Sequence, residues 1–176
     1  HKNDYVLFLG RIVPEKGVHY LIEAFNKLNT NKKLVIAGGA SDSNEYYQHI
    51  QPMANQDSRV ILTGFIQGQA LKELYSNAYI YVLPSDLEGM PMSLLEAMSY
   101  GNCCLTSDIP ECAEVVEGHA ATFQHGSVES LREKLQELLE NDDLVQRYKA
   151  NAADYIVSKY SWDDVTDQTL NLYGGE

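Results

Sequence analysis

Basic residues are scarce in this chain of 176 residues. Only 13 lysines and arginines stand against 25 aspartates and glutamates, which gives a net charge of −12 at pH 7. A surface that binds nucleic acid needs an excess of basic residues, because the ligand carries a negative charge on each phosphate. The composition therefore argues against nucleic acid as a partner. Much of the acidic excess falls in the last third of the chain, where a solvated helical surface accounts for it.

Cysteines, metal-ligand patterns and long apolar runs are also rare or absent. The sequence has three cysteines, and none forms the Cys-x-x-Cys spacing of a zinc site. Cys103 and Cys104 are adjacent, so in a strand they would point to opposite faces and would not readily pair. This usage favours a reducing, cytoplasmic compartment in which the cysteines act as small buried hydrophobic residues. No apolar run approaches the roughly 20 residues of a membrane-spanning helix.

Short apolar runs alternate with segments of helical periodicity. The runs predict strands at residues 5–9, 34–37, 60–62, 79–83, 103–106 and 120–123. Apolar residues spaced by three and four, and the polar segments between the runs, predict helices at 18–28, 44–55, 69–77, 93–100, 128–140, 144–158 and 162–172. Repeated β-α units of this length indicate an α/β fold: a Rossmann-like parallel sheet of about six strands, with helices on both faces and extra C-terminal helices. Ligands of such sheets bind beyond the carboxyl ends of the strands.

The loop after the first predicted strand carries two cations. It reads Gly10-Arg11-Ile12-Val13-Pro14-Glu15-Lys16-Gly17. Arg11 offers a fork of donors to phosphate oxygens, Lys16 supplies a mobile positive charge, and the following helix N-terminus adds partial positive charge. The loop is not a P-loop, because no glycine precedes Lys16 and no serine or threonine follows it. These residues alone leave two interpretations open, a diphosphate-binding loop and a solvated basic loop.

Two carboxylates flank a Gly-Pro turn after the fourth predicted strand. Glu88 and Glu96 lie eight residues apart in Glu88-Gly89-Met90-Pro91-Met92-Ser93-Leu94-Leu95-Glu96. The predicted helix begins inside this segment, so amides near Met90 to Leu94 could face an anion. Carboxylates beside an anion site suggest a ligand with hydroxyl donors as well as phosphate, such as a nucleotide sugar. For an isolated pair the alternative is that Glu88 favours the helix dipole and Glu96 is solvated.

The other strand-end loops have weaker patterns. Gly38-Gly39 lacks the Gly-x-Gly-x-x-Gly spacing of a dinucleotide site, so a plain break after the strand is the favoured interpretation. The Thr63-Gly64-Phe65-Ile66 turn either accepts a nucleobase against its backbone or is a packed turn with Phe65 in the core. The segment Ser107-Asp108-Ile109-Pro110-Glu111 is another strand-end loop, in which Asp108 and Pro110 are interpreted as turn residues.

Together these segments resemble the C-terminal, donor-binding half of a GT-B glycosyltransferase, most closely the retaining family 4, also called group 1. The resemblance runs from Tyr5 to about Tyr173 and rests on Gly10–Gly17, Leu34–Gly39, Glu88–Glu96, Ser107–Glu111 and Ser161-Trp162. It implies one half of a GT-B fold, and so a single nucleotide-sugar-binding domain over residues 1–176. The N-terminal acceptor domain of such a two-domain enzyme is expected to be missing from this chain.

The resemblance implies a role for each matching residue. Arg11 and Lys16 would hold the donor diphosphate and stabilise the leaving group, and Glu88 would lie beside the transferred sugar. Glu96 would accept hydrogen bonds from the ribose hydroxyls, and Ile66 would meet the base through its backbone. The remaining donor-binding positions are Gly10, Gly89, Met90, Pro91, Ser93, Leu94 and Leu95.

The implied function is donor binding in a retaining enzyme that transfers a hexosyl group from a nucleotide diphosphate sugar to an unknown hydroxyl acceptor. Cations placed at the departing diphosphate would stabilise its developing charge, and no metal or other cofactor is expected. An Asp-x-Asp-like metal motif at Asp86-x-Glu88 is the less favoured alternative. The expected partners are the nucleotide-sugar donor and the missing N-terminal domain, with membrane association of the longer enzyme left open.

Two other functions stay open. One is a non-catalytic nucleotide-sugar-binding or regulatory module, and the other is a sugar phosphorylase or nucleotide-sugar epimerase on the same fold. The chain alone is expected to bind the donor weakly and to turn over little or nothing. The residues name neither the base, the sugar nor the acceptor.

Overall fold

The computed structural model describes residues 1–40 and 44–160 of the chain. The helix predicted at 162–172 and the Ser161-Trp162 segment lie outside these ranges. In chain order the elements are β1 (Tyr5–Leu9), the 3-10 helix η1 (Pro14–Lys16), α1 (Val18–Asn26), β2 (Lys33–Ala37), α2 (Asn44–Asn55), β3 (Val60–Gly64), α3 (Gln69–Asn77), β4 (Ile80–Leu83), α4 (Met92–Ser99), β5 (Cys103–Ser107), α5 (Pro110–Val116), β6 (Ala121–Phe123), α6 (Val128–Glu140) and α7 (Asp142–Lys159).

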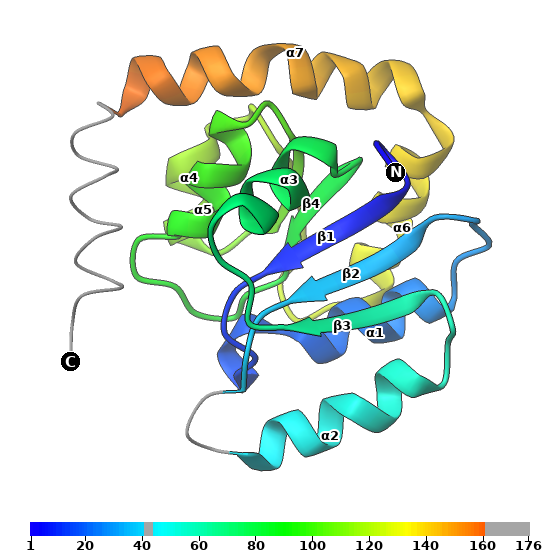
Figure 1. Ribbon diagram of the computed structural model, residues 1–176. Helices are drawn as coiled ribbons and strands as arrows, with labels where there is room; N and C mark the ends of the chain where they lie inside the picture. Colours follow the sequence, from blue (N-terminus) through cyan, green and yellow to red (C-terminus); the bar gives the residue numbers. More distant parts are fainter. Residues whose placement is uncertain (41–43, 161–176) are drawn as a thin grey trace.

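The strands form one parallel sheet. Within the described ranges it has six strands in the order β3-β2-β1-β4-β5-β6, and every neighbouring pair is parallel. Helices α1 and α2 cover one face and α3 and α4 the other, while α7 passes over α4 (Figure 1). The predicted Rossmann-like α/β sheet is therefore confirmed. The order reverses direction between β1 and β4, which is where sheets of this kind bind ligands.

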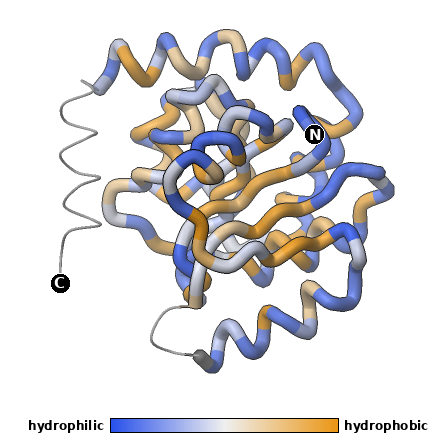
Figure 2. Tube along the Cα trace, viewed as in Figure 1, coloured by the Kyte–Doolittle hydropathy of each residue, from blue (hydrophilic) through white to orange (hydrophobic). Residues whose placement is uncertain are grey.

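The core runs along the central strands. Every residue of β1, β4 and β5 is buried, as expected for parallel strands with helices on both faces. Figure 2 shows the hydrophobic residues concentrated along β1 and β2. The cysteines Cys103, Cys104 and Cys112 are free and buried, and burial raises the pKa of Cys103 to about 12. Their predicted use as small hydrophobic residues is confirmed.

The interpretation of Pro110 as a turn residue was wrong, whereas Asp108 does lie in the short connection after β5. Strand β5 extends to Ser107 and helix α5 begins at Pro110, with Ile109 as its N-cap residue. Proline suits the first position of a helix, because its N–H would have no partner there and its φ already fits. A proline soon after a strand is therefore typical of both a turn and a helix start. The burial of Cys112, Val115 and Val116 on one side of α5 decides between them.

The C-terminal helices extend the sheet's cover. Helix α7 begins at Asp142, two residues before its predicted start, and the side chain of Asn141 caps it by accepting a hydrogen bond from the Leu144 N–H. Tyr79 ties α7 to the sheet by donating to Asp142 Oδ1 at 2.9 Å. No helix in the described ranges combines the length and hydrophobicity that a membrane crossing requires.

Gly38 lets the loops at the carboxyl edge of the sheet close on one another. A Cβ atom at this position would lie 1.8 Å from the carbonyl oxygen of Gly10. The same junction is held by backbone hydrogen bonds from Gly38 N–H to Gly64 O at 3.0 Å and from Ile12 N–H to Gly39 O at 3.1 Å. Gly38-Gly39 is therefore more than a break after a strand, because it joins the loops that follow β1, β2 and β3.

Replacement of this glycine tests the junction. We expect Gly38→Ala to lower the free energy of unfolding by about 3 kcal/mol. The new methyl group overlaps a backbone carbonyl, and a backbone group cannot move aside by changing rotamer as a side chain can. Gly39→Ala is the matched control, since its Cβ would meet only Phe65 Cβ at 3.7 Å. Urea denaturation of both variants measures the difference. Equal stabilities would show that the contact with Gly10 is not limiting.

Candidate functional site

A cleft of about 620 Å³ opens at the carboxyl edge between β1 and α4. Its lining contains most of the predicted site residues: Gly10, Arg11, Lys16, Glu88, Gly89, Met90, Ser93 and Glu96. A smaller pocket of about 100 Å³ adjoins it, and its lining includes Ile66 together with Gly10 and Arg11. Residues that are up to 86 positions apart in the chain thus face one another at the predicted edge.

Lys16 is placed by close packing of its loop against the end of β4. Gly17 has a φ of +72° and a Cβ there would lie 2.1 Å from the carbonyl oxygen of Pro84. The Asp86 N–H also donates to the carbonyl oxygen of Glu15 at 2.8 Å. These backbone contacts bring Lys16 Nζ to 2.7 Å from Glu88 Oε1, although the two residues are 72 positions apart. The cation of one loop is therefore paired with the carboxylate of another.

Glu88 is buried and held by two donors. Its side chain is 5% exposed, against 20% for Lys16. Ser85 Oγ donates to the same oxygen, Oε1, at 2.6 Å, and Ser107 Oγ donates to the Ser85 carbonyl oxygen at 2.6 Å. A buried carboxylate needs such compensation, because it loses its hydration. The alternative in which Glu88 only favours a helix dipole does not describe these contacts.

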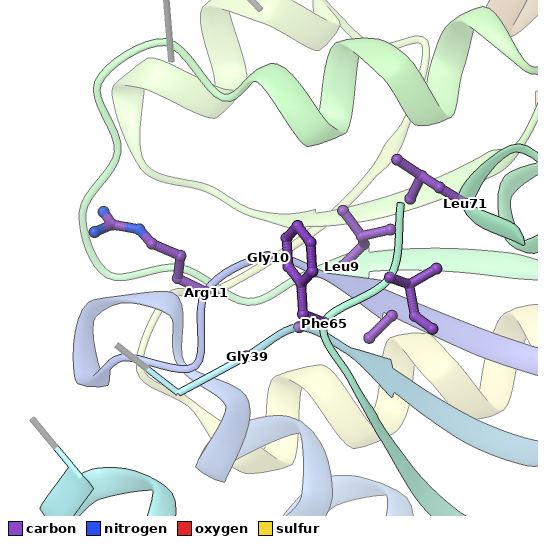
Figure 3. Close-up of a pocket in the computed structure, with 9 residues that line it drawn as sticks. Leu9, Gly10, Arg11, Gly39, Phe65 and Leu71 are labelled. Atoms are coloured by element: carbon purple, nitrogen blue, oxygen red, sulfur yellow. The ribbon is translucent and has the colours of Figure 1, made fainter. Parts of the chain in front are cut away.

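Arg11, unlike Lys16, forms no ion pair with a carboxylate of the described residues. It is exposed, and it lines both the cleft and the smaller pocket. Figure 3 shows its guanidinium group extending away from the pocket, beyond Gly10. An exposed guanidinium with free donors can meet an anion that enters the cleft.

The turn between Glu88 and α4 divides the predicted residues into two groups. Gly89, Met90 and Ser93 line the cleft. Pro91, Leu94 and Leu95 are buried behind it. The N–H groups of Leu94 and Leu95 already donate to the Pro91 carbonyl oxygen, at 3.1 and 3.2 Å. Gly89, Met90 and Ser93 can therefore contact a ligand, whereas Pro91, Leu94 and Leu95 stabilise the start of α4.

Glu96 lines the cleft from the first turns of α4. Tyr75 donates its hydroxyl hydrogen to Glu96 Oε2 at 2.9 Å. Partial burial raises the pKa of Glu96 above its ordinary value, and the hydrogen bond from Tyr75 opposes this by stabilising the ionised form. Glu96 is therefore a partly buried acceptor, which the alternative of a merely solvated side chain does not describe.

Sequence reasoning missed three residues of the site. Phe65 is 66% exposed and lines the smaller pocket (Figure 3), so its alternative place in the core was wrong. An aromatic residue directly after the glycine that ends β3 was the available signal. Ser85 and Tyr75 are both buried. Ser85 contacts Glu88 within its own loop, three residues away, so a serine just before the glutamate was the available signal. Tyr75 contacts Glu96 across 21 residues, and nothing in its local sequence separates it from an ordinary core position.

The alternative of a metal motif at Asp86-x-Glu88 gains no further metal ligands among the described residues. Asp86 accepts a hydrogen bond from the Tyr20 hydroxyl at 2.9 Å, and Glu88 is occupied by Lys16 and Ser85. Over residues 1–40 and 44–160, no three His, Cys, Asp or Glu side chains lie close enough together to hold a metal ion.

The sequence is similar to those of curated proteins. Among curated relatives, the uncharacterized glycosyltransferase MJ1607 of Methanocaldococcus jannaschii is 31% identical over 172 residues, covering 96% of this chain and 44% of that protein. The alpha-maltose-1-phosphate synthase of Mycolicibacterium smegmatis is 25% identical over 181 residues, covering 96% of this chain and 47% of that protein. The chain thus spans about half the length of the curated relatives it matches.

The fold also matches a solved structure. Anabaena Alr3699/HepE, crystallised in complex with UDP and glucose, superposes with a TM-score of 0.85 at 18% identity, over 99% of this chain and 49% of that one. At this identity the match shows the fold alone. Residues 1–155 match the family model described as glycosyl transferases group 1. The chain therefore belongs to the group 1 glycosyltransferase family.

Proposed function

We propose that this chain is the C-terminal, donor-binding domain of a two-domain, retaining family 4 glycosyltransferase. The observation that carries the proposal is the cleft itself, which brings Arg11, Lys16, Glu88 and Glu96 into one lining. Two cations and two carboxylates suit a ligand that has both phosphates and hydroxyl groups. The HepE structure contains UDP and glucose, which supports a nucleotide diphosphate sugar as that ligand.

Each residue then has a chemical role. Arg11 and Lys16 bind the diphosphate and stabilise the charge that develops on it as the glycosidic bond breaks. Glu88 lies beside the transferred hexosyl group, with the backbone of Gly89, Met90 and Ser93 close to the sugar and the phosphates. No metal is required in this scheme, because the cations of the protein occupy its place.

The nucleoside lies along the other end of the site. Glu96 accepts hydrogen bonds from the ribose hydroxyls, and the base enters the smaller pocket against Ile66. Phe65 adds an exposed aromatic ring there, which suits stacking on a base. The acceptor site belongs to an N-terminal domain outside this chain, so the chain alone binds the donor and transfers little or no sugar.

Removal of Arg11, the cation of the cleft that forms no ion pair within the described residues, tests the contact with the diphosphate. We expect Arg11→Ala to weaken the binding of UDP, GDP or ADP, whichever binds most tightly, by about tenfold or more, because a charge-assisted hydrogen bond contributes roughly 1.5–3 kcal/mol. Calorimetric titration measures the affinity. Arg147→Ala is the matched control, since Arg147 is also exposed but lies on α7 away from the cleft. Equal affinities in both variants would contradict the assigned role of Arg11.

For the Lys16–Glu88 ion pair we predict the opposite effect, a substitution that strengthens the binding of a nucleoside diphosphate. The charge of Lys16 that a diphosphate would meet is already partly compensated by Glu88, and the diphosphate must also approach the buried negative charge of Glu88. We therefore expect Glu88→Gln to tighten the binding of UDP by about threefold to tenfold, which is on the order of 1 kcal/mol. The same substitution should not tighten the binding of a nucleotide sugar, because the sugar loses its contact with the carboxylate.

The control for this effect is Glu15→Gln, which removes an exposed carboxylate from the same loop as Lys16. It changes the net charge equally but leaves the ion pair intact. UDP affinity that falls in Glu88→Gln, or rises equally in both variants, would show that Glu88 does not weaken the contact between Lys16 and the diphosphate.

A further inference from the structure

Tyr75 is a buried tyrosine whose hydroxyl group is hydrogen-bonded to Glu96, a residue that lines the cleft. The residue lies on α3 and is 1% exposed. Its hydroxyl donates to Glu96 Oε2 at 2.9 Å and lies 3.5 Å from the carbonyl oxygen of Ser93. Its ring is stacked on that of Tyr100, with centroids 5.1 Å apart and planes at 8°. The ring is thus fixed, and its hydroxyl is directed at one oxygen of a proposed ligand-binding carboxylate.

Packing alone does not require this hydroxyl group. A phenylalanine would fill the same volume, and a buried hydroxyl costs free energy unless it is hydrogen-bonded. The backbone at this position is anchored separately, because Asn102 Nδ2 donates to the Tyr75 carbonyl oxygen at 2.9 Å. The hydroxyl contact with Glu96 is therefore separate from the anchoring of the backbone.

The bond from Tyr75 leaves the other oxygen of Glu96 for a ligand. No hydrogen bond to Glu96 Oε1 occurs within residues 1–40 and 44–160. No side-chain oxygen in these ranges is both buried and without a partner, so Oε1 is open at the cleft that Glu96 lines. An ionised carboxylate only accepts hydrogen bonds, so this oxygen selects a donor such as a hydroxyl group.

We propose that Tyr75 is a positioning residue that holds Glu96 as an acceptor for ribose hydroxyls, and that it thereby makes the site prefer a ribonucleotide to its deoxy counterpart. This inference rests on the proposed function, in which Glu96 faces the ribose. Tyr75 does not touch the ligand. Its effect passes through the orientation and the ionisation of the Glu96 carboxylate.

The ionisation of Glu96 provides a second readout. The titratable and charged groups around it are Tyr75 of α3, Tyr81 of β4, Tyr100 after α4 and, in the cleft lining, Arg11, Lys16 and Glu88. Burial raises the pKa of Glu96, and the Tyr75 hydrogen bond lowers it. Loss of that bond therefore raises the pKa further, and the loss of nucleotide affinity on acidification begins at a higher pH.

The test compares Tyr75→Phe with Tyr5→Phe. Tyr5 is a matched control, because it is 9% exposed and also donates its hydroxyl to α3, at the Leu74 carbonyl oxygen 2.6 Å away, but it does not line the cleft. UDP, GDP and ADP and their 2′,3′-dideoxy counterparts are titrated calorimetrically. We expect Tyr75→Phe to weaken ribonucleotide binding about tenfold, to leave dideoxynucleotide binding unchanged, and to move the acid limb to higher pH. Tyr5→Phe should change none of these.

The outcomes separate this inference from the proposed function. If the wild-type protein binds none of the nucleotides, or binds ribo- and dideoxynucleotides equally, the proposed ribose contact of Glu96 is wrong and the preference assigned to Tyr75 falls with it. If the wild-type protein prefers ribonucleotides and Tyr75→Phe keeps the full preference, the role of Tyr75 alone is overturned. Equal losses for both classes of nucleotide would also overturn it, because they indicate a general disturbance of the site.

A titration without ligand tests the positioning step directly. Carbon-13 NMR of labelled glutamate, with the Glu96 signal identified by its loss in Glu96→Gln, follows the carboxyl group through its pKa. We expect the pKa of Glu96 to rise in Tyr75→Phe and to stay unchanged in Tyr5→Phe. An unchanged pKa in Tyr75→Phe would show that the hydroxyl does not hold the carboxylate.

Discussion

Backbone contact between the loops at the carboxyl edge is the constraint on which the site depends. Gly38 lies against the carbonyl oxygen of Gly10, and Gly17 lies against that of Pro84, at distances that exclude any Cβ atom. These two contacts join the loop after β1 to the ends of β2 and β4. Because a backbone-to-backbone contact has no side-chain rotamers, it fixes the loops without the entropy cost of ordering long side chains. The cation of Lys16 reaches Glu88 only because the chain is held in this way.

Charge compensation follows from that arrangement. A carboxylate that is 5% exposed would be costly alone, and Glu88 is stabilised by the Lys16 ammonium group and the Ser85 hydroxyl. Arg11 forms no ion pair with a described carboxylate and is exposed. The two cations of one loop therefore differ in the charge that a diphosphate meets. Arg11 offers a diphosphate an uncompensated charge, whereas the charge of Lys16 is already partly compensated by Glu88.

The sequence predicts the sheet well because its strands are fully buried and therefore apolar throughout, as in Tyr5–Leu9. It also predicts the cleft, since Arg11, Lys16, Glu88 and Glu96 all follow strand ends. It does not predict which amides and hydroxyls support the site. The pairing of Tyr75 with Glu96 depends on how α3 packs against α4, and no local pattern encodes that. Helix α5 was missed for another reason, because Pro110 is compatible with both a turn and a helix start.

The two carboxylates of the cleft share one design. In each, a buried hydroxyl group donates to a single oxygen: Ser85 to Glu88 Oε1 and Tyr75 to Glu96 Oε2. The two carboxylates differ in charge compensation, because Glu88 also accepts from the Lys16 ammonium group at the same oxygen, whereas the neutral Tyr75 hydroxyl orients Glu96 without cancelling its charge. Each carboxylate keeps its other oxygen as an acceptor that is already oriented before a ligand arrives. Binding costs less entropy at a group that is ordered in advance, so sugar and ribose hydroxyls can be recognised by a site that is open to solvent on one side.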